Sequence, residues 1–289
     1  MRGFFFECSL CLKSFLIFFS NYFTWYDFRM TTKVEMFKYF DQFTEKNKIL
    51  VNQFISRFPF HKNYYNKKSL DFGSGTGCLS FKMAEKVGSI TGIEIDPLLS
   101  EYSKNKLKEY SKTIQEKVVF ENISINQISD ASYDLIFSKD VFEHVRDVEN
   151  IMDEMYRVLK PGGECVIGFG PLWYSPFGDH GILRSSIGFT LPWLHLILGK
   201  EVIVRLYNNS SLKGEKKYSK RRIEDLRSYL NFKTGEYFRN LINNSKFEII
   251  WYDENIHENL IINYFRKFFI RGPLSRFFIR NIYCQLKKN

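Results

Sequence analysis

Cysteine is scarce in this chain of 289 residues, which contains only 5 of them. An odd number of mostly isolated cysteines does not make the disulfide framework of a small secreted domain. Cys8 and Cys11 form a C-x-x-C pair, but no second pair or histidine cluster completes a zinc site. Hydrophobic residues at 44% and charged residues at 26% exclude collagen-like, mucin-like and wholly disordered chains. We therefore expect a reduced, cytoplasmic globular protein.

The chain also lacks an apolar run long enough to span a bilayer. The longest uncharged stretch near the N-terminus covers the 13 residues 14–26, whereas a spanning helix needs about 20. Residues 21–25 offer no convincing cleavage site for a secretory signal. Three interpretations of residues 1–30 stay open: a helix that caps the core, an over-long gene start ahead of Met30, or a membrane-surface anchor.

Acidic residues are absent after Glu258, in a chain whose net charge is +10. Arginines and lysines alternate with phenylalanines there, and residues 259–270 are expected to form a basic amphipathic helix. Such a helix suits the surface of an anionic membrane, and a core-packed helix with a solvated basic side is the alternative. Nucleic acid is not expected as a partner, because neither an N-P-P-Y-like motif nor a separate RNA-binding domain occurs.

A short apolar strand that ends at Phe72 leads into a glycine-rich turn and then into a predicted helix over 78–87. The turn reads Gly73-Ser74-Gly75-Thr76-Gly77, with Asp71 two residues before its first glycine. Glycines let the backbone approach a ligand closely, and the start of a helix offers unpaired N–H groups. This order is typical of the start of a nucleotide-binding βαβ unit, although the spacing differs from that of pyrophosphate binders.

Strands and helices alternate along the rest of the chain. Further strands are predicted at 89–95, 117–121, 133–138, 164–170, 247–251 and 281–287, with helices at 97–111 and 147–159. The pattern predicts an α/β fold with a Rossmann-like, doubly wound sheet of about seven mostly parallel strands, helices on both faces, and an α-rich insertion after strand five. We divide the chain into residues 1–30, a helical cap at 31–66, a cofactor-binding core at 67–170, a lid insertion at 171–245 and C-terminal strands at 246–289.

Polar residues stand at the ends of consecutive predicted strands. Glu94 ends the second strand and is placed to accept both hydroxyls of a ribose. Asn122 follows the third strand and Ser138 ends the fourth. Each alone is an ordinary strand-end or turn residue. Open parallel sheets bind ligands at this edge, so their joint placement predicts a ligand site.

Five motifs in this order resemble the class I S-adenosylmethionine-dependent methyltransferases, including the ubiquinone- and menaquinone-type and bacterial saccharide enzymes. They are L-D-F-G-S-G-T-G (70–77), G-I-E-I-D-P (92–97), S-Y-D-L-I-F-S (132–138), F-E-H-V (142–145) and R-V-L-K-P-G-G (157–163). The resemblance implies S-adenosylmethionine as cofactor and S-adenosylhomocysteine as product. The implied cofactor-binding residues are Asp71, Gly73, Ser74, Gly75, Gly77, Glu94, Ile95, Asn122, Ile123 and Ser138. The family usually has Asp where this chain has Asn122, and an amide can still pair with an adenine edge.

Acidic and imidazole side chains follow the fourth strand at the mouth of the expected cleft. In a helix, Asp140, Glu143 and His144 would share one face and could hold a divalent cation or share a proton. A similar pattern is associated with magnesium in quinone-biosynthesis O-methyltransferases, but Glu-His also occurs in the family without metal. A divalent cation is left open and no metal ligand is assigned. Asp140 and His144 are the catalytic candidates, with His180 as a further base.

Aromatic residues concentrate in the insertion after the fifth strand, where they suit a planar or ring-shaped acceptor under a lid. His195 lies in a strongly apolar run and is expected to be a packed histidine. The sequence thus predicts methyl transfer to a small-molecule or lipid- or saccharide-linked acceptor, most readily on oxygen. Transfer to nitrogen or carbon of a metabolite, and a non-catalytic cofactor-binding subunit, are the alternatives.

Overall fold

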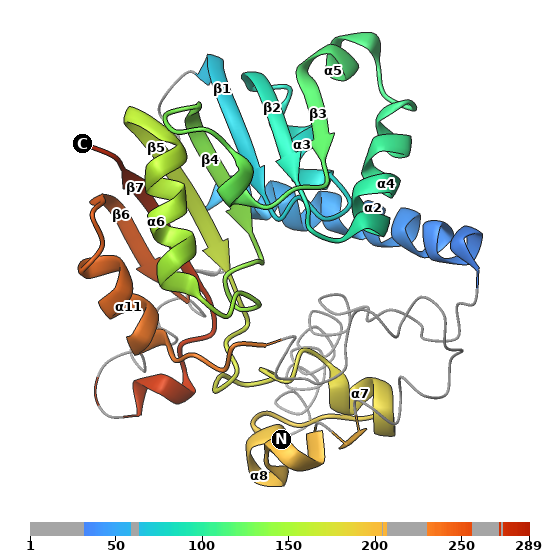
Figure 1. Ribbon diagram of the computed structural model, residues 1–289. Helices are drawn as coiled ribbons and strands as arrows, with labels where there is room; N and C mark the ends of the chain where they lie inside the picture. The colour runs from blue at the N-terminus through green and yellow to red at the C-terminus, as the bar shows by residue number, and fades with distance from the viewer. Residues whose placement is uncertain (1–31, 59–63, 204, 207–229, 256–271, 273) are drawn as a thin grey trace, which may run out of the picture.

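A seven-stranded sheet with the strand order β3-β2-β1-β4-β5-β7-β6 forms the centre of the molecule (Figure 1). The computed structural model describes residues 32–58, 64–203, 205–206, 230–255, 272 and 274–289. The strands are β1 (Tyr64–Phe72), β2 (Val87–Ile93), β3 (Val118–Glu121), β4 (Tyr133–Lys139), β5 (Leu159–Phe169), β6 (Glu248–Glu254) and β7 (Ile282–Lys287). β1 to β5 are parallel, and β7 runs antiparallel between β5 and β6. The predicted seven-stranded, mostly parallel sheet is confirmed.

Helices cover both faces of this sheet. The helices of the chain include α2 (Lys33–Ser56), α3 (Cys78–Met83), α4 (Pro97–Leu107), α5 (Lys112–Lys117), α6 (Val148–Val158), α7 (Ile182–Ile187), α8 (Leu194–Leu198) and α11 (Gly235–Asn243), with the 3-10 turns η1 (Ile125–Gln127) and η3 (Ser275–Phe277). Of these, α7 and α8 pack away from the sheet, in a cluster of their own. One face packs against α2 and α3 in a cluster that includes Phe54 and Phe81. The other packs against α6 and α11 through residues such as Met155 and Phe238. Burial of these two apolar layers holds the sheet in place.

Side chains that accept backbone N–H groups set where the helices begin. Thr32 and Glu35 form a capping box at the start of α2. Asp96 caps α4 by accepting from the backbone of Leu98 and Leu99, and Pro97 occupies the first helical position. These local signals agree with the predicted helix starts.

Several predicted boundaries differ from the structure, among them the helix predicted at 97–111, which ends at Leu107. Two others differ because sheet pairing extends further than the local pattern suggests. α3 ends at Met83 instead of 87, since Val87 is buried and pairs with Tyr64 of β1. β5 begins at Leu159 instead of 164. The expected turn at 160–163 lies within β5, at the place where the β4–β5 register shifts and where Gly162 has φ +75°.

The insertion after β5 is helical in its described part, as predicted, and forms a lobe with its own apolar core. That core includes Trp173, Leu183 and Leu230. The parallel strands point toward α7 and α8 in Figure 1, so the lobe lies at the carboxyl edge of the sheet. By contrast, α11 falls within 171–245 but packs on the sheet through Phe238, whose ring meets Phe169 at 4.6 Å.

The N-terminal segment 1–30, with Cys8 and Cys11, and the expected basic helix at 259–270 lie outside the described residues. Within the described ranges, no helix is both long and apolar enough to cross a membrane.

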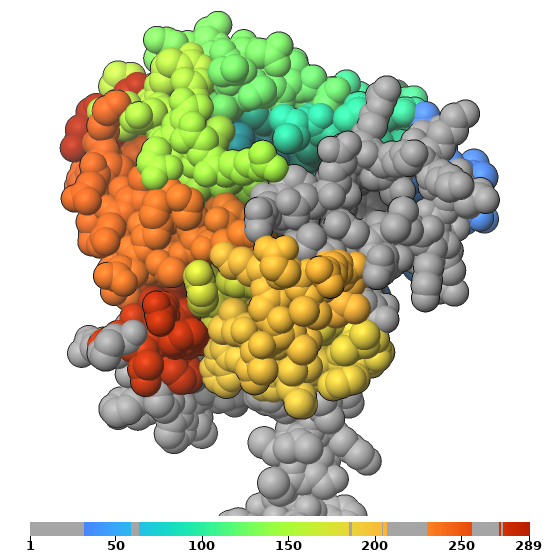
Figure 2. All heavy atoms as spheres, turned by 60° about the horizontal axis from the view of Figure 1, so that its bottom comes forward, coloured from blue at the N-terminus to red at the C-terminus, as the bar shows by residue number. Residues whose placement is uncertain are grey.

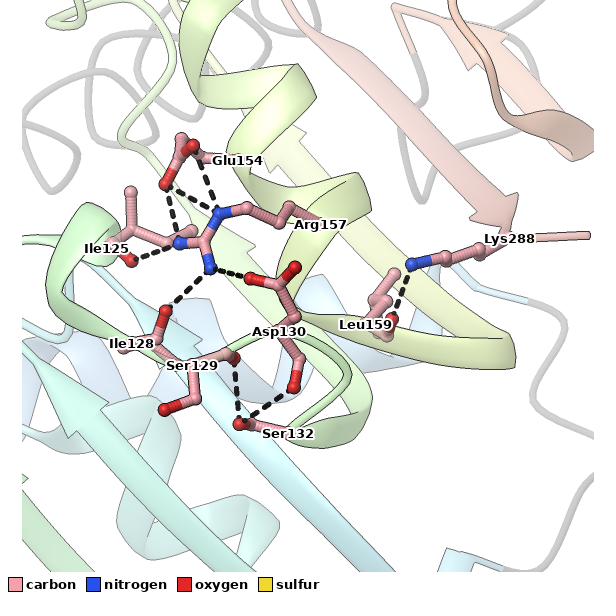
Figure 3. A network of polar contacts seen from close by, with 9 residues as sticks. All are labelled: Ile125, Ile128, Ser129, Asp130, Ser132, Glu154, Arg157, Leu159 and Lys288. Carbon is pink, nitrogen blue, oxygen red and sulfur yellow. Dashed lines mark hydrogen bonds and ion pairs between the residues drawn. The ribbon is translucent and has the colours of Figure 1, made fainter.

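Arg157 of α6 ties that helix to the connection between β3 and β4 (Figure 3). Its guanidinium donates to the carbonyl oxygens of Ile125 and Ile128 at 3.2 and 2.7 Å. It also pairs with Asp130 and Glu154 at 2.6 and 2.7 Å. A planar group with five donors can serve several fixed acceptors at once, which an ammonium cannot do. The chain that follows the carboxyl end of β3 is thereby held against α6.

We expect Arg157→Ala to lower the free energy of unfolding by about 2 kcal/mol, because two backbone carbonyls lose a charged donor. Arg157→Lys should recover only part of this loss, since one ammonium cannot reproduce the fork. Urea denaturation of both variants measures the effect, with the exposed Arg146→Ala as control. An Arg157→Ala midpoint equal to that of Arg146→Ala would contradict a stabilising role for the network.

Candidate functional site

The glycine loop at the carboxyl end of β1 is packed closely from two sides. A Cβ atom at Gly77 would lie 2.5 Å from the ring of Phe120, and one at Gly73 would lie 2.5 Å from Cγ2 of Val141. Both glycines also have positive φ, +82° and +72°. The loop therefore requires glycine at these positions for space and for conformation. Gly75 differs, because a Cβ there would meet nothing within 4 Å, so this side of the loop is open.

Asp71 lies directly beneath this loop and is only 1% exposed. Its Oδ2 accepts a hydrogen bond from Ser80 Oγ at 2.6 Å. Burial raises the pKa of the Asp71 carboxyl to about 7, against the hydrogen bond from Ser80, and the charge of Glu94 raises it further. A cationic group placed beside it would stabilise the charged carboxylate. Ser80 is not predicted from the sequence, although its place in the first turn of α3 is a usable signal.

Glu94 joins the loop to the end of β2. Its Oε2 accepts from the backbone N–H of Gly75 at 3.0 Å, and its Oε1 accepts from that of Asp96 at 2.9 Å. Asn122 donates its amide to the carbonyl oxygen of Glu94 at 2.6 Å. Each carboxylate oxygen can accept more than one hydrogen bond, so the oriented carboxylate can still receive two hydroxyls. The role of Asp96 in orienting Glu94 was not predicted.

The remaining predicted cofactor residues surround this edge in different ways. Ile95 is 77% exposed and offers an apolar side chain beside Glu94. Ile123 is partly buried and packs against the core cluster of the α6 face. Ser138 is buried, and its hydroxyl donates to the carbonyl oxygen of Phe72 at 3.4 Å, between β4 and β1.

The residues at this edge fit S-adenosylmethionine. Ser74 Oγ is buried and has no hydrogen-bond partner among the residues that the structure describes. Together with the loop N–H groups, it can serve the carboxylate of the methionine moiety. Asp71 can serve its ammonium group, and Glu94 the ribose hydroxyls. The carboxylate and the ammonium of the methionine moiety and the ribose hydroxyls therefore each have a complementary group at this edge.

The segment after β4 is a turn, so the helical arrangement that would align Asp140, Glu143 and His144 on one face does not occur. Asp140 has φ +56°, and its N–H donates to Gly168 O at 2.9 Å, which extends the pairing with β5. The N–H of His144 closes a turn onto Val141 O. The helix α6 begins only at Val148.

The acidic side chains of this segment have opposite environments. Asp140 is paired with Lys139 and is half exposed, whereas Glu143 is buried and its Oε1 accepts from Gly170 N–H at 3.1 Å. Burial, followed by the charge of Asp140, raises the pKa of Glu143 to about 8. No group of three His, Cys, Asp or Glu side chains within the described ranges is arranged to hold a metal ion.

Two histidines from different parts of the chain meet beside this turn. The rings of His144 and His180 lie edge to face with centroids 5.4 Å apart. His180 Nε2 donates to Pro171 O at 2.8 Å, and burial, followed by the charge of His144, holds the pKa of His180 well below its usual value. His180 is therefore neutral near pH 7. His195 is buried within the lobe against Trp173, as expected for a packed histidine.

Comparison with known proteins gives matches to methyltransferases. The methyltransferase domain family matches residues 70–167. A ubiquinone biosynthesis O-methyltransferase of Idiomarina loihiensis is 32% identical over 115 residues, 37% of this chain and 46% of that protein. The phosphoethanolamine N-methyltransferase 2 of Caenorhabditis elegans is 30% identical over 99 residues, 34% of this chain and 22% of that protein. The chain thus spans less than half the length of these curated relatives.

Solved structures share the fold at low sequence identity. The phosphoethanolamine N-methyltransferase 2 of Haemonchus contortus, solved in complex with S-adenosyl-L-methionine, gives a TM-score of 0.52 at 15% identity, covering 82% of this chain and 52% of that one. The [4+2]-cyclase SpnF gives 0.51 at 14% identity, covering 84% and 81%. At these identities the likeness concerns the fold alone. From the matched family, the sheet order and the complementary loop, this chain contains a class I S-adenosylmethionine-dependent methyltransferase domain.

Proposed function

We propose that the protein transfers a methyl group from S-adenosylmethionine to an oxygen atom of a small-molecule acceptor, which includes lipid- and saccharide-linked acceptors. The carrying observation is the pair of carboxyls, Asp71 and Glu94, at the ends of adjacent strands around an open glycine loop. The bound cofactor supplies a methyl group already activated on a sulfonium. The chain's own task is to position the acceptor and exclude water.

We assign the acceptor to the turn after β4 and to the lobe beyond β5, which would act as its lid. His144 would take the proton of an acceptor hydroxyl, because an imidazole is basic enough for this near pH 7. His180 is neutral and hydrogen-bonded to Pro171, so it can support the ring of His144. Asp140, paired with Lys139, would set the charge at the entrance to the acceptor site.

The choice of oxygen as the methylated atom is part of this proposal. The matched relatives include an O-methyltransferase and an N-methyltransferase, so transfer to nitrogen is the second candidate, with transfer to carbon beside it. The likeness to a cyclase favours keeping a third candidate, a cofactor-binding protein that does not transfer methyl groups. Binding of S-adenosylmethionine without transfer of its labelled methyl group to any acceptor would favour this third candidate.

The Glu94 carboxylate is tested by calorimetric titration with S-adenosylmethionine and S-adenosylhomocysteine. We expect Glu94→Gln and Glu94→Ala to weaken both by about tenfold or more, because two hydrogen bonds to a charged group are lost. Glu101→Gln, an exposed change on α4, is the matched control. If folded wild-type protein binds neither compound, the proposal fails.

His144 is tested by turnover with labelled S-adenosylmethionine and a panel of a catechol, a hexose-containing lipid and phosphoethanolamine. On a hydroxyl acceptor we expect His144→Ala to lower turnover by about 100-fold or more, because proton removal is lost. The affinity for the cofactor should be unchanged. Turnover of His144→Ala equal to that of the wild type would remove the catalytic role, and label on phosphoethanolamine alone would favour nitrogen.

We further propose that the lobe contacts an anionic membrane surface. Large apolar side chains are exposed along the lobe and next to η3; they are Ile187, Phe189, Leu191, Ile197, Val202 and Leu274. The two segments adjoin, since Trp193 Nε1 donates to Phe277 O at 2.9 Å, and Figure 2 shows them side by side (yellow to orange, and red). The exposed Arg184, Arg205 and Arg276 lie in the same segments. Exposed apolar residues flanked by cations suit a lipid headgroup region.

Sedimentation with vesicles of phosphatidylglycerol and phosphatidylcholine tests this contact. We expect the protein to sediment with anionic vesicles at low salt and to be released as salt screens the arginines. The double variant Phe189→Ser and Ile197→Ser should bind at least about fivefold more weakly, because apolar area no longer leaves water. Val34→Ser, exposed on α2, is the control. Equal binding of the double variant and the control would contradict the assignment to the lobe.

A further inference from the structure

Both stems of the insertion contact the same turn, the post-β4 turn of residues 142–145. The entering stem donates from Gly170 N–H to Glu143 Oε1 at 3.1 Å. The leaving stem donates from Asn231 N–H to the carbonyl oxygen of Glu143 at 3.0 Å. Glu143 is buried between them. The turn that carries His144 is therefore held where the lobe leaves the core and where it returns.

The side chain of Asn231 fixes both ends of this turn. Its Nδ2 donates to Phe142 O at 2.7 Å and to Val145 O at 2.8 Å. Its Oδ1 accepts from the backbone N–H of Lys233 at 3.0 Å, which sets the orientation of the amide. Counting its own N–H, Asn231 binds three carbonyl oxygens of one turn. No other residue type offers two amide donors and an acceptor at this length from the backbone.

The two neighbours of Asn231 are anchored in the lobe. Leu230 is buried in the lobe core. Phe232 packs edge-on against Trp173, with centroids 4.7 Å apart, and adopts φ +55°. Leu230 and Phe232 thus contact the lobe, whereas Asn231 between them contacts the turn. Because Leu230 and Phe232 pack in the lobe, a displacement of the lobe would reach the turn through Asn231.

We infer that Asn231 is a positioning residue for methyl transfer: it fixes the post-β4 turn, and with it the imidazole of His144, to the lobe that covers the acceptor. This role rests on the proposed function in so far as His144 acts on the acceptor. The contacts themselves do not depend on which acceptor is used. Packing of an acceptor against the lobe would be transmitted to His144 by the same three hydrogen bonds.

The imidazole resonances of His144 report its position without any acceptor. Five histidines give few signals, and the one lost in His144→Gln identifies His144. We expect Asn231→Ala to shift this signal and its titration midpoint, and to leave cofactor affinity within about twofold of the wild type. Turnover on whichever panel acceptor takes label from wild-type protein, the catechol first, should fall about tenfold or more while KM for S-adenosylmethionine stays unchanged.

Asn255→Ala is the matched control, because the Asn255 amide also binds backbone on both sides, at Phe278 O and Arg280 N–H, but at the end of β6. It should lower the melting temperature without moving the His144 signal. If Asn231→Ala does not fold, Asn231→Asp is used, since a carboxylate cannot donate to Phe142 and Val145. A His144 signal at its wild-type position in a folded Asn231 variant overturns the inference. A shifted His144 signal in the Asn231 variant, together with no label transfer by wild-type protein to any acceptor of the panel, would contradict the proposed function alone.

Discussion

The ring of Phe120 lies against two positions that have no side chain, Gly77 in the loop and Gly92 in β2. A Cβ atom at either would come within 2.6 Å of the ring. Phe81 of α3 packs edge-on against the same ring at 5.4 Å. The glycine loop, β2, β3 and α3 are therefore fixed relative to one another by one aromatic side chain. The positions of the Asp71 and Glu94 carboxyls follow from this packing, because each extends from one of these elements or from its neighbour β1.

Two carboxyls are buried at the carboxyl edge of the sheet, those of Asp71 and Glu143. Asp71 lies under the loop and Glu143 under the stems of the lobe, and burial raises their pKa values to about 7 and about 8. Burial thus favours the protonated form of each carboxyl near neutral pH. The two sites respond differently to a ligand. A cation beside Asp71 favours its ionisation, whereas Glu143 faces the N–H of Gly170 and is enclosed by protein.

Local sequence patterns were sufficient to predict the sheet. Apolar strands, the glycine turn and the polar residue at each strand end are separated by few residues, so Asp71 and Glu94 could be proposed from the sequence as cofactor-binding residues. The post-β4 turn could not be predicted, since Asp140 adopts a left-handed conformation that aspartate reaches only occasionally. Asn231 was missed for another reason: its partners lie 86 and 89 residues away, and no periodicity records such a contact.

The order of the last two strands has a consequence for how the chain assembles during synthesis. β7 follows β6 in sequence but lies between β5 and β6, and its backbone is paired on both sides. The parallel strands β1 to β5 can associate as they leave the ribosome, because each of β2 to β5 pairs with a strand that precedes it in the chain. β6 must wait for a strand that is translated about 30 residues later before it joins the sheet. We therefore expect the sheet to remain incomplete during synthesis until β7 is translated. β7 then inserts between β5 and β6 and completes the sheet.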